Sequence, residues 1–95
     1  MTISELNNLS DRECISVLWG DNVLEVIDNQ TTTPMTMDEF LKHCTACGGN
    51  WGGMLLTGIN DLYPAVYEAI PDNMGHFAWL AICTTMKLLN IESES

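Results

Sequence analysis

The first third of the chain carries two short runs of β-branched and aromatic residues, Ile15 to Trp19 and Val23 to Ile27. Three turn-forming residues, positions 20–22, separate them. Such runs on either side of a short turn are typical of a β-hairpin. Alternation along the first run would place Ile15, Val17 and Trp19 on one face. The pattern therefore predicts a hairpin over residues 14–28.

Residues 1–13, before this hairpin, are polar and give no clear pattern. Ser10 to Glu13 has the form of a helix capping box. Because strand-like residues follow directly, the sequence assigns no definite structure to this segment.

The period of the apolar residues changes after Pro34. Thr36 and Glu39 form a capping box, and apolar residues follow at helical spacing. This helix is expected to continue to about Cys47 and to end at Gly48-Gly49.

Further helices are expected after this glycine pair. Asn50 is a candidate N-cap for a helix whose apolar stripe comprises Trp51, Met54, Leu55 and Ile59. A short helix is expected from Pro64 to Ile70, and another of about 17 residues from Asn73. This last segment is apolar on nearly every side. It is therefore expected to lie centrally or in an oligomer interface.

The order of these elements predicts an α+β fold in a single domain, residues 1–95. An N-terminal β-hairpin would pack on a C-terminal bundle of three to four helices, residues 36–91. The acidic end, residues 92–95, is expected to be a disordered tail.

Charge is the strongest signal in the composition. Thirteen acidic residues oppose three basic ones, which gives a net charge of −10. Such a charge repels nucleic acid and anionic membranes and attracts basic protein surfaces. Six of the acids fall in the first thirty residues against Arg12 alone. The candidate partner-binding residues are therefore Asp11, Glu13, Asp21, Glu25 and Asp28, with Glu25 facing solvent if Leu24 and Val26 face inward.

The sequence gives little indication of catalysis or of a cofactor. Cys44 and Cys47 have the spacing of two zinc ligands, with Cys14, His76 or Cys83 available to complete a site. A second close pair is absent, and cysteines are commonly buried without metal. A redox role is opposed by their expected place near a helix C-terminus, where the dipole disfavours a thiolate. We therefore assign no metal, no cofactor and no enzymatic activity.

The expected location is the cytoplasm. The N-terminal residues have neither the basic start nor the apolar stretch of a signal peptide. The longest apolar run, Phe77 to Cys83, has seven residues, whereas a membrane span needs roughly 20.

Three segments resemble small acidic proteins encoded by phages and mobile elements of Gram-positive bacteria. The segments are residues 43–51 (His43-Cys44-Thr45-Ala46-Cys47-Gly48-Gly49-Asn50-Trp51), 62–64 (Leu62-Tyr63-Pro64) and 70–75 (Ile70-Pro71-Asp72-Asn73-Met74-Gly75). The resemblance covers about half of the chain and supplies no catalytic residues. It implies a setting in which such proteins often disarm host defence, as anti-CRISPR and anti-restriction proteins do.

These observations lead to one expected function and two alternatives. We expect a non-enzymatic inhibitor that binds a host defence protein and presents acids in place of nucleic-acid phosphates, inside the host cell if the gene is carried by a phage. The first alternative is an adaptor or homodimer assembled through apolar helices. The second is a small zinc-binding module.

Overall fold

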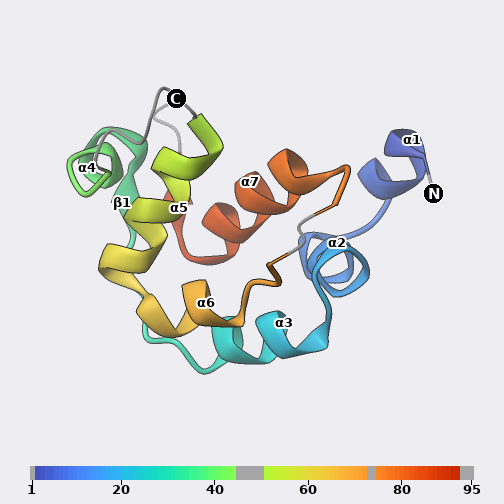
Figure 1. Ribbon diagram of the computed structural model, residues 1–95, viewed down its shortest axis with the longest axis horizontal. Coiled ribbons are helices and arrows are strands. Elements are labelled where there is room, and N and C mark those ends of the chain that lie inside the picture. The colour runs from blue at the N-terminus through green and yellow to red at the C-terminus, as the bar shows by residue number, and fades with distance from the viewer. Residues whose placement is uncertain (1, 45–50, 73–74, 93–95) are drawn as a thin grey trace.

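The computed structural model describes residues 2–44, 51–72 and 75–92. This part of the chain forms a compact α+β fold of seven helices and one pair of short strands, as Figure 1 shows. The helices are α1 (Ile3–Asn7), α2 (Asp11–Leu18), α3 (Asp21–Asp28), α4 (Met37–Leu41), α5 (Trp51–Leu62), α6 (Pro64–Ala69) and α7 (Ala78–Leu88). The strands β1 (Met35–Thr36) and β2 (Ile91–Glu92) pair in parallel.

The α+β class is as expected, but the predicted N-terminal hairpin is wrong. Residues 14–28 belong to α2 and α3, two helices joined by Trp19 and Gly20. The buried positions follow a helical period, since Ile15 and Trp19 are buried whereas Val17 is 52% exposed. Val23 and Ile27 are likewise the buried residues of α3. Packing of one apolar stripe on each helix outweighs the β-propensity of the individual residues.

Local signals define the starts of these helices. Ser10 is the N-cap of α2, and its hydroxyl accepts a hydrogen bond from the amide of Glu13. Thr2 and Glu5 form a capping box at α1, where the sequence assigned no structure. Gly20 precedes α3 with a φ of 102°, a conformation that residues with a side chain rarely adopt.

Two of the four predicted C-terminal helices begin where expected. The capping box of Thr36 and Glu39 opens α4, which ends at Leu41, six residues before the expected end. Pro64 opens α6, and Ile70 is its C-cap. The expected glycine stop and the expected N-caps Asn50 and Asn73 lie outside the described residues. Within the described residues, the last helix begins at Ala78, after turn residues at 76–77.

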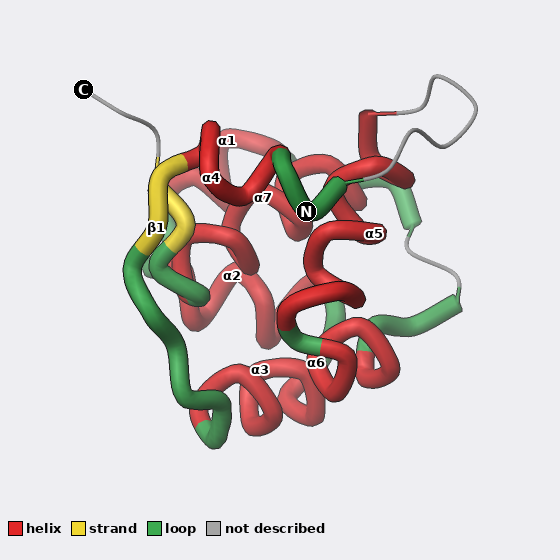
Figure 2. Tube along the Cα trace, turned by 90° about the vertical axis from the view of Figure 1, so that its left-hand side faces the viewer, coloured by secondary structure: helices red, strands yellow, loops and turns green. Residues whose placement is uncertain are grey.

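The core surrounds α7, which runs through the middle of the molecule in Figure 1. This helix packs against α2 and α5, and its Ala81 and Ile82 are 0% and 2% exposed. α3 and α6 lie side by side below it in Figures 1 and 2. The N-terminal helices, predicted as a hairpin packed on the bundle, are thus part of the bundle itself.

The strand pair joins distant parts of the sequence. Met35 pairs with Ile91 and Thr36 with Glu92, as the adjacent yellow segments of Figure 2 show. Asn90 makes the turn from α7 with a φ of 64°, and its carbonyl accepts the amide of Met35 at 3.0 Å. Glu92, expected in a disordered tail, lies in β2, and the rest of that tail lies outside the described residues.

Candidate functional sites

The first candidate site is an acidic stripe along α3, formed by Asp21, Glu25 and Asp28. These residues are four and three positions apart, so they share one side of a helix. All three are exposed, whereas Val23 and Ile27 face the core. The expected exposure of Glu25 is correct, but it arises from helical periodicity and not from alternation along a strand.

The acidic stripe is tied to α2 at both of its ends. The Arg12 guanidinium donates to both carboxylate oxygens of Asp28, with Nη2 and Oδ2 2.7 Å apart. The hydroxyl of Ser16 donates to Asp21 near the turn between the helices. Side-chain contacts therefore join α2 and α3 at both ends of the stripe. The hydrogen bond from Arg12 holds the pKa of Asp28 below its ordinary value.

The remaining predicted partner-binding residues lie at the start of α2. Asp11 and Glu13 flank Arg12 and are exposed. The carboxylate of Glu13 accepts a hydrogen bond from the Ser10 hydroxyl at 3.0 Å. The helical pair, residues 11–28, thus presents all five predicted acids, with Asp28 paired to the one arginine in this segment.

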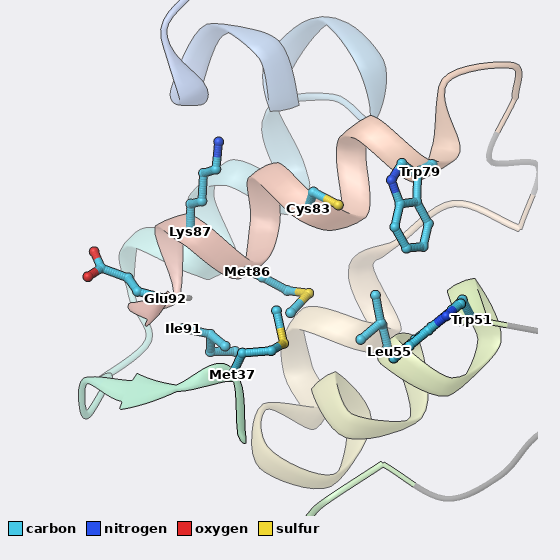
Figure 3. Close-up of a pocket in the computed structure, with 9 residues that line it drawn as sticks. All are labelled: Met37, Trp51, Leu55, Trp79, Cys83, Met86, Lys87, Ile91 and Glu92. Atoms are coloured by element: carbon cyan, nitrogen blue, oxygen red, sulfur yellow. The ribbon is translucent and has the colours of Figure 1, made fainter. Parts of the chain in front are cut away.

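The second candidate site is an apolar groove that the sequence analysis did not predict. It has a volume of about 790 Å³ and lies between α5, α7 and the ends of the strand pair. Met37, Leu55, Met86 and Ile91 supply much of its lining. In Figure 3 the sulfur atoms of Met37 and Met86 approach each other from opposite walls.

The ends of the apolar groove differ in chemistry. Trp51 and Trp79, in the first turns of α5 and α7, lie at one end of the groove in Figure 3. Their side chains are 56% and 54% exposed. Lys87 and Glu92 lie at the other end, and the Lys87 amine points away from the methionines. Cys83 lies between these ends on α7, and burial raises the pKa of its thiol.

One sequence signal did point to this groove. The last helix was expected to be apolar on nearly every side, and the structure divides those sides between two environments. Ala81 and Ile82 enter the core, whereas Trp79 and Cys83 line the groove. Met86, at the same helical spacing, is 2% exposed and belongs to both the core and the groove lining. The other wall could not be anticipated, because Met37 and Leu55 reach it from separate helices.

His43 and Cys44, which the structure describes, are held by separate contacts. The Cys44 thiol donates to the carbonyl of Phe40, and burial raises its pKa, so the thiol form is favoured at neutral pH. The exposed His43 contacts Asp61, with Nδ1 and Oδ2 2.7 Å apart. Cys47, which with Cys44 has the spacing of two zinc ligands, lies outside the described residues. Among the described residues there is no group of three or more His, Cys, Asp or Glu placed to hold a metal ion.

Comparison with known proteins adds no assignment. No protein-family model, curated protein sequence or solved structure matches this chain. Among the described helices, none has the length and apolarity needed to cross a membrane.

Proposed function

We propose that this protein is a non-enzymatic inhibitor that binds a host defence nuclease, or another nucleic-acid-binding protein, in the host cytoplasm. The acidic stripe supports the proposal most directly, because it places Asp21, Glu25 and Asp28 along one exposed side of α3. A basic groove built for phosphates would accept this row of carboxylates. The resemblance to proteins of phages and mobile elements supplies the biological setting.

The carboxylates along α3 have a spacing of the same order as phosphates on DNA, although wider. At about 1.5 Å of rise per residue, the acidic stripe extends over about 10 Å. Its carboxylates are therefore about 5 Å apart along the axis, against about 3.4 Å per phosphate of one DNA strand. Arg12 partly neutralises the far end, so Asp21 and Glu25 are the residues whose charge would matter most. Association should be fast and strongly dependent on salt.

The test is inhibition of DNA cleavage by purified Cas nucleases and restriction endonucleases of Gram-positive bacteria. The variant is Asp21→Asn with Glu25→Gln, which removes two charges and keeps the helix. Asp28 stays unchanged because its removal would free Arg12. We expect binding to an inhibited nuclease to weaken by about tenfold, chiefly through a slower association rate at low salt.

The matched control is Glu68→Gln with Asp72→Asn. These two exposed acids lie beside a separate hollow near Leu56, so the control removes the same charge elsewhere. It should keep nearly all of the affinity. Inhibition of no nuclease in the panel, equal effects of both double variants, or binding that ignores salt would each contradict the proposal.

A further inference from the structure

We propose that the apolar groove is a docking site for a basic amphipathic helix of a partner protein. Its lining and rim combine two large aromatic side chains with two methionines, and both tryptophans are more than half exposed. Tryptophan is among the residues that contribute most to binding at protein interfaces. Methionine adapts its shape to different apolar partners. Such a lining is typical of a surface that binds apolar side chains of another protein.

The shape of the walls favours a helix over a strand. α7 presents Trp79, Cys83 and Met86 along one side, and α5 presents Trp51 and Leu55 one turn apart. Two helical walls with an apolar floor form the kind of groove into which an amphipathic helix inserts residues at i, i+3, i+4 and i+7. A strand would need an edge to pair with, and β1 and β2 have two residues each.

Charge selects a basic occupant. The protein carries a net charge of −10, so a second copy in the groove would bring like charges together. At the strand end, Glu92 lines the groove beside Lys87, and the exposed Asp38 and Glu39 follow Met37 along the chain, so acids outnumber the one lysine in these segments. Lysine or arginine on the polar face of the docked helix would meet these carboxylates.

The probe is a synthetic peptide of about 18 residues, about 27 Å long as a helix, with leucine on one face and lysine on the other. One control has the same composition in an order without an apolar face. A second control keeps the leucine face and replaces lysine with glutamate. The amphipathic basic peptide should bind at least about tenfold more tightly than either control.

Three groove residues, Trp51, Trp79 and Cys83, can show whether the peptide binds in the groove. Trp19 is only 7% exposed, so a blue shift of tryptophan fluorescence on binding reports Trp51 and Trp79. Bound peptide should also slow the alkylation of Cys83, measured by mass spectrometry of the fragment that contains it. The double variant Trp51→Ala with Trp79→Ala, at two positions that are more than half exposed, should lose about tenfold in affinity.

The acidic-stripe variant separates this proposal from the preceding one. Asp21→Asn with Glu25→Gln should retain the preference for the amphipathic peptide, whether or not nuclease inhibition survives. Three results would overturn the docking proposal: equal binding of the reordered peptide, unchanged binding by the double tryptophan variant, or no protection of Cys83. A wild-type dimer that the tryptophan substitutions dissociate would assign the groove to self-association instead.

Discussion

The acidic stripe exposes charged side chains and the apolar groove exposes apolar ones, so the two surfaces differ in how favourably water hydrates them. Charged side chains on α3 are well hydrated, so they serve solubility even without a partner. Exposed tryptophans at the mouth of an apolar groove are poorly hydrated, and covering their apolar surface lowers the free energy. The groove is therefore the stronger structural sign of a partner, whereas the acidic stripe indicates the sign of that partner's charge.

The largest effect on stability should come from a substitution on the core side of α7, compared with one on its groove side. Ile82 is 2% exposed and lies in the core, so Ile82→Ala should lower the free energy of unfolding by about 2–5 kcal/mol. Trp79→Ala, on the groove side, should cost less than about 1 kcal/mol. Urea denaturation of both variants measures the difference. Equal losses would mean that Trp79 supports the fold as much as the core side does.

An intermediate effect on stability should come from disturbing the contact between α5 and α4, two helices that contribute residues to the groove. Gly58 of α5 packs so closely on α4 that an added Cβ would lie 2.7 Å from both the Phe40 ring and the Cys44 sulfur. Gly58→Ala should therefore cost about 1–3 kcal/mol, despite alanine's higher helix propensity.

Peptide binding by Gly58→Ala should weaken, while salt-dependent binding through the acidic stripe should remain. Asn60→Ala, at an exposed position of the same helix, is the control for both measurements. A Gly58→Ala variant as stable as the wild type would show that α4 can shift away from α5 without loss.

The smallest effect should come from the ion pair behind the acidic stripe. Arg12 holds the pKa of Asp28 below its ordinary value of 3.8. The resulting stability is present above that ordinary value and is lost as the pH falls through the lower pKa of the folded protein. Arg12→Gln should remove this part of the acid dependence, measured by melting temperature against pH. Lys42→Gln removes an equal charge from the end of α4 and should leave the dependence unchanged.

The sequence predicted best the elements that depend on local signals. The capping box at Thr36 and the proline at the start of α6 were sufficient to locate two helices. For α2 and α3, the same residues satisfied both a strand and a helix pattern. The exposure of Val17 distinguishes these patterns, and that exposure is decided by packing of α2 on α7 and α3.

The two sites were predictable to different degrees for a related reason. The acidic stripe lies within eight consecutive residues, so counting charges was enough to find it. The apolar groove combines residues from positions 37 to 92, and only the assembled fold brings them together. The tryptophans carried no sign that they would be exposed, because apolar residues in helices are more often buried.

The parallel pairing of β1 with β2 has a consequence for the order of folding. It closes a loop between residues 35 and 91, more than half of the chain, whereas α2 and α3 need close only a short one. Long loops close at a higher entropic cost, so this pairing should form late and break early. The amide of Met35, which bonds to Asn90, should then exchange with deuterium faster than that of Trp19, the C-cap of α2, which bonds to Ile15. Because Ile91 belongs to β2 and Met37 follows β1 directly, local opening of the strand pair would disrupt the groove while the helices stay folded.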